Sequence, residues 1–293
     1  MRLLNVGCGR CIHPDWTNID MVAHAPSVIE HDLRRGLPFS DDSFDGIYSS
    51  HVLEHLTPAS ADAMLAECRR VLRPGGVLRI VVPDLEGITR EYLHALEKAA
   101  ATGDDRSLAN HQWMTIELID QLVRERSGGR MGPLLGNPDV INRDFIRQRL
   151  GHETDGNSKL QELAHQRSVW QTLTRYLRRK SQRLGNSVAE VAVRCVHGRS
   201  GRDAYRECRF RQCGEVHRWM YDRVSLAKLL TDRGFSEARV CRAEESQIDR
   251  FDEFQLDRDG TQIRKPDSLF MEAINADCAD ESKTTASARR HAA

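Results

Sequence analysis

A short apolar strand that runs straight into two glycines is the feature that most constrains the fold of this chain. Residues 3–6 read Leu-Leu-Asn-Val, and Gly7, Cys8 and Gly9 follow at once. A glycine-rich turn after a strand lets the backbone approach a ligand closely, with its amides facing that ligand. Taken alone, the same turn is equally compatible with a tight connection that binds nothing.

An acidic residue closes the next expected strand, residues 16–20, which ends in Asp20. An acid at this position commonly accepts hydrogen bonds from the two ribose hydroxyls of a nucleoside cofactor. A solvated aspartate at a strand end would look the same in the sequence. The glycine turn and the acid together, in this order, are stronger evidence for a cofactor site than either feature alone.

Strands and helices alternate through the first 90 residues. Further strands are expected at 27–31, 44–50 and 77–82, and the last of these is nearly all apolar, as a central parallel strand should be. A helix is expected at 59–72, because Pro58 stands near its start and Pro74-Gly75-Gly76 follow its end. This order predicts an open, mostly parallel sheet with helices on both faces.

The chain changes character after the fifth strand and returns to the sheet pattern near its end. Residues 89–214 are polar, with helical patterns at 89–101, 115–126, 142–150 and 160–184. A helix at 225–231 and a strand at 237–241 follow, and 254–256 with 268–273 form either a strand pair or a strand and a helix. We therefore divide the chain into a cofactor-binding half (1–88), a helical insertion on the acceptor side (89–214), a completion of the sheet (215–274) and a disordered tail (275–293).

Length and composition indicate an ordinary globular protein. The chain has 293 residues, of which 40% are hydrophobic and 29% charged, which excludes collagen, a wholly disordered chain and a disulfide miniprotein. No stretch approaches the roughly 18 apolar residues of a spanning helix, and the N-terminus lacks the apolar segment of a signal peptide. We expect a cytoplasmic protein whose eight cysteines are reduced thiols.

The net charge is zero, which argues against binding nucleic acid through bulk charge. The exception is a basic run at 175–183, where five Lys and Arg residues recur at helical spacing. One interpretation is a solvated helix face. The other is a docking face for an anionic partner, such as a phosphorylated lipid-linked sugar, a nucleotide sugar, a membrane surface or RNA.

The ordered set of motifs, more than any one of them, resembles a known family. The set comprises residues 4–9, 16–20, 31–33, 37–45, 49–56 and 71–78, the last of which contains Leu-Arg-Pro-Gly-Gly after a helix. It resembles the class I S-adenosylmethionine-dependent methyltransferases, specifically their type 11 branch, over residues 2 to about 88. A weaker match resumes at 214–222 and 229–235. The resemblance implies a Rossmann-like sheet of seven strands, six parallel and one antiparallel.

The resemblance also implies roles for individual residues. The loop of Asn5, Gly7, Cys8 and Gly9 would lie against the methionine part of S-adenosyl-L-methionine, and Asp20 would bind its ribose. The remaining implied contacts are Asp32 with Leu33 at the adenine, and Ser50 with His51 beside the sulfonium and the acceptor pocket. Asn5 stands where the family usually has an acid, and Cys11 where it often has a third glycine.

A nicotinamide-dependent enzyme fits the same residues less well. The dinucleotide fingerprint needs a third glycine three positions after the second, where this chain has Ile12. It also needs an acid roughly 20 residues further on, whereas Asp20 follows Gly9 much sooner. These two departures argue against a dehydrogenase.

Methyl transfer requires the acceptor, the methyl group and the sulfur in line, and a base if the acceptor is a hydroxyl. His51 and His217 are the candidate bases, because histidine is neutral at working pH without assistance. Asp84 is the alternative, although it is at least as well placed to cap the segment that follows it. His55 lies one helical turn beyond His51, and we expect it to serve packing.

We expect no metal ion. Cys195, His197, Cys208, Cys213 and His217 could supply soft or imidazole ligands, but their spacings match structural zinc sites only loosely. Reduced thiols are the better interpretation of these cysteines.

The sequence therefore predicts an S-adenosyl-L-methionine-dependent methyltransferase. By analogy with the family, the acceptor would be a sugar hydroxyl of a glycan or glycolipid. A small-molecule metabolite and RNA are the alternatives. A binding module without catalysis is the alternative from a different class, given Asn5 and Cys11.

Overall fold

The structure is a computed structural model that describes residues 1–151 and 169–276; for 169–184 it describes the backbone alone. The side chains of the basic run at 175–183, and all but the first two residues of the tail expected at 275–293, lie outside the described residues. No helix in the described ranges combines the length and the apolarity that crossing a membrane requires.

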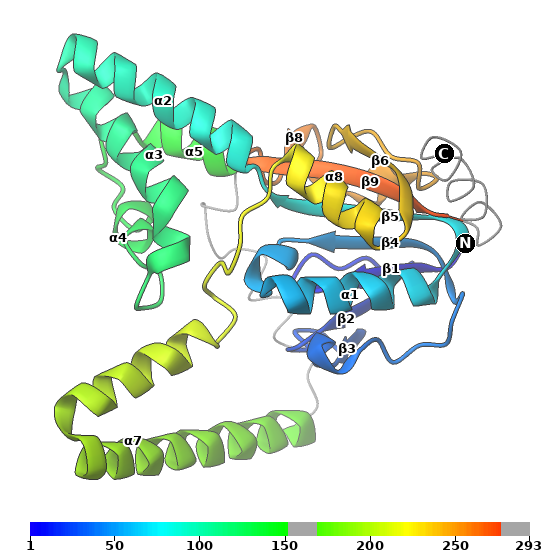
Figure 1. Ribbon diagram of the computed structural model, residues 1–293, viewed down its shortest axis with the longest axis horizontal. Coiled ribbons are helices and arrows are strands. Elements are labelled where there is room, and N and C mark those ends of the chain that lie inside the picture. Colours follow the sequence, from blue (N-terminus) through cyan, green and yellow to red (C-terminus); the bar gives the residue numbers. More distant parts are fainter. Residues whose placement is uncertain (152–168, 277–293) are drawn as a thin grey trace, which may run out of the picture.

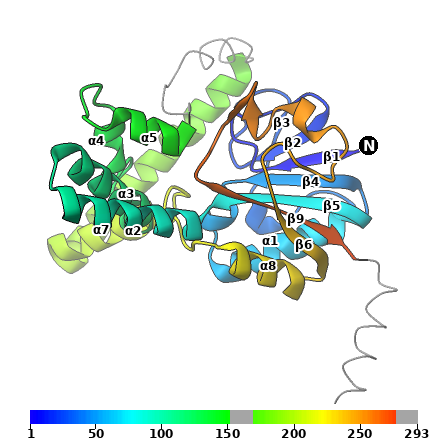
Figure 2. The same ribbon diagram turned by 90° about the horizontal axis from the view of Figure 1, so that it is seen from above.

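A seven-stranded sheet forms the body of the protein, in the order β3-β2-β1-β4-β5-β9-β6 (Figures 1 and 2). Every neighbouring pair is parallel except those of β9, which runs antiparallel to both β5 and β6. Six strands thus share one direction, which confirms the predicted fold class. The strands are β1 (Leu3–Val6), β2 (Trp16–Asp20), β3 (Val28–Glu30), β4 (Phe44–Ser50), β5 (Leu72–Pro83), β6 (Phe235–Cys241) and β9 (Ser268–Asn275).

Helices α1 (Pro58–Val71) and α8 (Arg223–Asp232) cover one face of the sheet and share its largest hydrophobic core (Figure 1). Local sequence explains where each helix begins. The Thr57 side chain accepts a hydrogen bond from the Ser60 amide, and Pro58 occupies the first turn of α1. Asp222 and Ser225 form a reciprocal capping box at the start of α8.

We expected helices on both faces of the sheet, but the segment between β6 and β9 covers the opposite face. Its core brings together side chains of β1, β2, β4 and β5 with Ala243, Ile248, Phe251 and Leu256, from the segment between β6 and β9. That segment contains the short helix η5 (Phe251–Phe254) and the small hairpin of β7 (Arg258–Asp259) and β8 (Gln262–Ile263). The expectation was wrong because the short connection from Gly9 to β2 leaves no room for a helix.

The insertion after β5 forms a separate group of helices beside the sheet (Figure 2). It has its own core, centred on the fully buried Trp113, whose indole donates to Glu117 at 2.8 Å. Glu117 in turn pairs with Arg149 at 2.6 Å. The helices of this group are α2 (Leu85–Thr102), α3 (Asp105–Val123), α4 (Met131–Leu135) and α5 (Arg143–Leu150). Helix α7 (Val169–Arg211), which is kinked at Gly198, also belongs to the insertion but lies apart from them (Figure 1).

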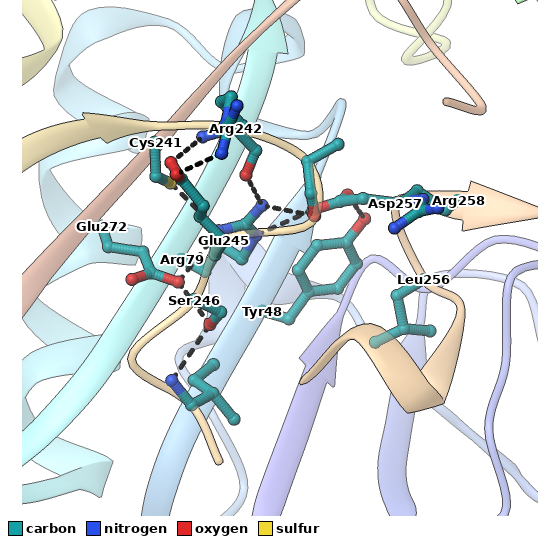
Figure 3. A network of polar contacts seen from close by, with 12 residues as sticks. Tyr48, Arg79, Cys241, Arg242, Glu245, Ser246, Leu256, Asp257, Arg258 and Glu272 are labelled. Atoms are coloured by element: carbon teal, nitrogen blue, oxygen red, sulfur yellow. Dashed lines mark hydrogen bonds and ion pairs between the residues drawn. The ribbon is translucent and has the colours of Figure 1, made fainter. Parts of the chain in front are cut away.

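A buried arginine ties the segment between β6 and β9 to the sheet (Figure 3). Arg79, in β5, is fully buried and pairs with Asp257 at 2.7 Å and with Glu272 at 2.9 Å. The Tyr48 hydroxyl donates to the other oxygen of Asp257 at 2.6 Å. The Arg79 guanidinium also donates to the backbone carbonyls of Arg242, Ala243 and Glu245 and lies over the ring of Phe251.

Candidate active site

The glycine loop stands at the carboxyl end of β1, between β2 and β4. Gly7 and Cys8 donate their amides to the Ile19 carbonyl at 2.8 and 3.2 Å, so the loop continues the pairing with β2. The Asn5 amide group, 1% exposed, donates to the Cys11 carbonyl at 2.9 Å and to Asn18 at 3.0 Å. Asn5 therefore holds both ends of the loop together.

Asp20 joins the glycine loop to the end of β2. One carboxylate oxygen accepts from the Gly9 amide and the other from the Val22 amide, both at 2.9 Å. Because each carboxylate oxygen has two lone pairs, both can still accept a hydroxyl. The structure thus places Gly9 and Asp20 next to each other at the carboxyl edge of the sheet, where ligands of open α/β sheets bind.

The two glycines of the loop differ in what surrounds them. Gly7 has φ +69°, and a Cβ there would lie 2.2 Å from the Val52 side chain. Gly9 has φ +51°, and a Cβ there would meet no atom within 4 Å. Gly7 is therefore required by packing inside the protein, whereas Gly9 faces open space that a ligand could fill. Between them, Cys8 is a buried thiol whose pKa burial raises to about 12.

Asp32 and Leu33 lie beyond β3, at the start of the short helix η1 (Leu33–Arg35). The Asp32 carboxylate caps this helix and forms an ion pair with Arg34 at 2.8 Å. Hydrogen bonding from Arg34 lowers the pKa of Asp32 to about 2. An adenine amine would have to share this carboxylate with Arg34, so Asp32 is a less open acceptor than Asp20.

His51 directly follows β4, after the half-buried Ser50. Its φ is +54°, a conformation that is uncommon outside glycine and that collects at functional sites. Its Nδ1 lies 3.1 Å from Glu54 Oε1, and its Nε2 lies 2.9 Å from Ser268 Oγ. Ser268, at the start of β9, could not have been paired with His51 from the sequence alone.

A cavity of about 310 Å³ opens beside His51, between the carboxyl edge of the sheet and helices α3 and α4 of the insertion. Its polar lining includes Gln121, Arg124, Lys265 and Asp267. Burial raises the pKa of the Asp267 carboxyl. Our sequence analysis missed all four residues, because they come from the insertion and from the segment before β9, where no motif marks them.

Glu54, His55 and His217 form a cluster beside His51, in which Glu54 and His217 are buried and His55 is partly buried. Glu54 is fully buried and His217 is 4% exposed. The rings of His55 and His217 meet edge to face at 4.8 Å, and His55 Nε2 lies 3.9 Å from Glu54 Oε1. Hydrogen bonds from the amides of Arg218 and Trp219 to the Glu54 carbonyl fix the segment that carries His217.

Burial and the surrounding imidazoles set the charges in this cluster. Burial alone would raise the pKa of Glu54, but the neighbouring histidines, His51 first among them, lower it to about 2. Burial lowers the pKa of His217 to about 3 and also lowers that of His55. Near neutral pH, Glu54 is therefore a carboxylate, and the rings of His55 and His217 are neutral.

The side chains of Asp84 and of the cysteines of the insertion take no part in this cluster. Asp84 is the N-cap of α2, where its carboxylate accepts from the Glu86 amide at 3.1 Å. This is the capping role that the sequence offered as an alternative to catalysis. Cys195 and Cys208 are exposed on α7 and Cys213 is exposed just after it, and within the described ranges they join no cluster of metal-binding side chains.

The fold and the geometry of its edge define a class: a Rossmann-like α/β protein with a glycine loop at the carboxyl end of β1, beside the ends of β2 and β4. Comparison with known proteins gives the family. Residues 4–80 match the family described as a methyltransferase domain. Over these residues the chain matches a methyltransferase domain, in agreement with its motifs.

Two curated relatives match the chain over short stretches. An uncharacterized 37.1 kDa protein in transposon TN4556 of Streptomyces fradiae is 47% identical over 57 residues, which are 19% of this chain and 16% of that protein. An uncharacterized methyltransferase of Synechocystis sp. is 37% identical over 49 residues, or 17% of this chain and 23% of that protein. The chain therefore aligns with less than a quarter of each relative's length.

Solved structures resemble the chain at low identity. The 1,6-didemethyltoxoflavin-N1-methyltransferase of Burkholderia thailandensis is 22% identical, with 28% of this chain and 44% of that one covered and a TM-score of 0.25. A methyltransferase of Thermotoga maritima, described as a possible histamine N-methyltransferase, is 11% identical, with 94% of this chain and 82% of that one covered and a TM-score of 0.36.

Proposed function

We propose that this protein transfers a methyl group from S-adenosyl-L-methionine to a hydroxyl of its acceptor. The observation that carries this proposal is the junction of Gly9 and Asp20 at the carboxyl edge of the sheet, inside the segment that matches the methyltransferase family. Gly9 leaves room for the methionine part of the cofactor, and Asp20 has oxygen lone pairs for its ribose. Asn5 orders the loop through hydrogen bonds instead of through charge.

We propose His51 as the residue that receives the proton of the acceptor hydroxyl. It lines the cavity, and contacts with Glu54 and Ser268 on either side hold its ring. His217 is a poorer candidate, because burial lowers its pKa to about 3. Asp84 is engaged at the start of α2. The sulfonium is already an activated methyl donor, so the protein chiefly aligns the reactants and removes the proton.

The cavity beside His51 supports a polar acceptor. Gln121, Arg124, Lys265 and Asp267 offer donors and acceptors of hydrogen bonds, which suit the hydroxyls of a sugar on a glycan or glycolipid. A small-molecule metabolite or RNA would use the same donors and acceptors.

Transfer of labelled methyl groups tests this function. Purified protein is incubated with cell extract and S-adenosylmethionine labelled in the methyl group, and the products are separated into glycan, lipid, RNA and small-molecule pools. The proposal expects label in the glycan or lipid pool. Label in another pool would overturn the sugar assignment, and no transfer to any pool would favour a binding module without catalysis.

Replacing Asp20 by alanine is expected to weaken cofactor binding about 10- to 100-fold. Charge-assisted hydrogen bonds to ribose hydroxyls are worth roughly 1.5–3 kcal/mol. Calorimetric titration with S-adenosylhomocysteine measures the change. The matched control is Asp32→Ala, for which we expect a smaller loss because Arg34 already occupies that carboxylate. An unchanged affinity for Asp20→Ala with an intact fold would remove Asp20 from the cofactor site.

A further inference from the structure

We propose that Glu54, His55 and His217 form a binding site for one divalent transition-metal ion, with Zn²⁺ the best match. Each residue offers one donor atom, and the three atoms lie within 4.8 Å of one another. Within the described ranges, no other group of three such side chains meets in this way. The site as such requires only these three residues, whatever reaction the protein performs.

Unpartnered buried atoms are the evidence that the cluster is built for a ligand. Glu54 Oε2 and His217 Nδ1 are buried and have no hydrogen-bond partner among the described residues, and Glu54 Oε1 has only its contacts with the rings of His51 and His55, at 3.1 and 3.9 Å. A buried carboxylate oxygen without a hydrogen bond is costly, since burial removes it from water without replacing the lost contacts. A bound cation would satisfy all three atoms at once.

The donor set selects the kind of metal. Two imidazoles and one carboxylate are the ligands of catalytic zinc sites and of other first-row transition metals, whereas Mg²⁺ and Ca²⁺ prefer oxygen ligands alone. Ligand bonds of about 2.1 Å place tetrahedral donors about 3.4 Å apart. The three side chains therefore need to move together by about an ångström. Three protein ligands leave a coordination position open.

The surroundings of the cluster fit a metal site in two further respects. His55 Nδ1 lies 3.4 Å from the Val216 carbonyl, which leaves Nε2 as the ring nitrogen that faces Glu54. Such a contact on the second ring nitrogen typically orients a metal-binding histidine. His51 touches Glu54 and also lines the cavity, so the cluster lies next to the proposed acceptor site.

A role for this metal follows only if the proposed methyl transfer is correct. A metal with an open position lowers the pKa of a bound hydroxyl and holds it in place. The acceptor hydroxyl would then be the open ligand, and His51 would stand beside it. This role rests on the proposed function, whereas the metal site does not.

The test measures metal binding without any cofactor or acceptor. Protein stripped with a chelator is titrated with Co²⁺, and the visible absorption of the bound ion reports its coordination. Elemental analysis after reloading with Zn²⁺ gives the stoichiometry. We expect one ion per chain and a Co²⁺ spectrum of nitrogen and oxygen ligands without thiolate bands. Loss of an outer contact alone costs 10–100-fold in metal affinity, so Glu54→Gln and His217→Ala are each expected to cost at least about 100-fold.

Two control variants separate this site from other metal-binding groups. His94→Ala removes an exposed histidine on α2, and a Cys208→Ser/Cys213→Ser variant removes two exposed thiols at the end of α7 and just beyond it. Both are expected to keep the wild-type spectrum and stoichiometry. The proposal is wrong if the wild-type protein binds no ion at micromolar concentrations, or if the cysteine variant loses the ion while the Glu54 variant keeps it. The titration of the wild-type protein alone shows whether a metal ion binds. Misfolding of a variant would therefore not leave metal binding untested.

Discussion

Replacing Arg79 by methionine is expected to lower the free energy of unfolding by about 3–5 kcal/mol. The change keeps most of the side-chain volume, but it leaves the Asp257 carboxylate buried without its cation and Glu272 with only the partly exposed Arg239. Breaking a buried ion pair from one side has a cost of this size, because the remaining charge is neither solvated nor paired. Burial already raises the pKa of Asp257, and removal of Arg79 would raise it further.

Denaturant titration of the wild-type protein and the variant measures this loss. The matched control is Arg90→Met, which removes an exposed arginine that pairs with Glu86 one helical turn away on α2. Exposed pairs of this kind contribute at most about 0.5 kcal/mol. A loss below about 1 kcal/mol for Arg79→Met would contradict the view that this network attaches the segment after β6 to the sheet.

Replacing His51 by asparagine is expected to lower turnover by at least about 100-fold while leaving cofactor affinity nearly unchanged. A positioned base contributes 10²–10⁴-fold to rate. Asparagine is the better replacement than alanine, because it tolerates the left-handed conformation of residue 51 (φ +54°). The variant should therefore keep its fold, which circular dichroism and thermal unfolding would check.

Steady-state kinetics at saturating cofactor, once an acceptor is identified, separates the two roles that His51 could have. Loss of a group that acts in the transition state lowers kcat, whereas loss of a purely binding contact raises KM. His94→Ala, an exposed histidine on α2, is the control and should behave as the wild type. A normal kcat in the His51 variant would move catalysis to another group or to alignment of the reactants alone.

The parts of the fold that could be predicted from the sequence are those fixed by local pattern. The strand at 44–50 and the helix after Pro58 are observed within a residue or two of their expected limits, because the residues that set these limits, such as the capping residue Thr57, are close in sequence. The Gly9–Asp20 junction was also predictable, since Gly9 lies just after β1 and Asp20 ends β2, and the motifs set the order of these strands. For the final strand, at 268–275, the sequence left two alternatives open, a strand or a helix, and the structure shows a strand.

The features that escaped the sequence analysis depend on partners far along the chain. Arg79 interrupts an apolar strand, and its carboxylate partners lie 178 and 193 residues away. His55 contacts the segment of His217 from 161 residues away. No period or spacing encodes such pairs. A charged residue inside an otherwise apolar central strand was the one available signal, and it indicates a buried counter-charge without saying which residue carries it.

Equilibrium binding of S-adenosylhomocysteine, followed by calorimetry, tests the central claim most directly. We expect the wild-type protein to bind one equivalent with micromolar or tighter affinity, and Gly9→Val to show no binding. The control is Gly103→Val: Gly103 also has a left-handed φ, of +65°, and its Cβ would also meet open space, but it ends α2 outside the site. This variant carries the same backbone strain and should bind as the wild type does. No binding by the wild-type protein, or equal binding by Gly9→Val with an intact fold, would contradict the account.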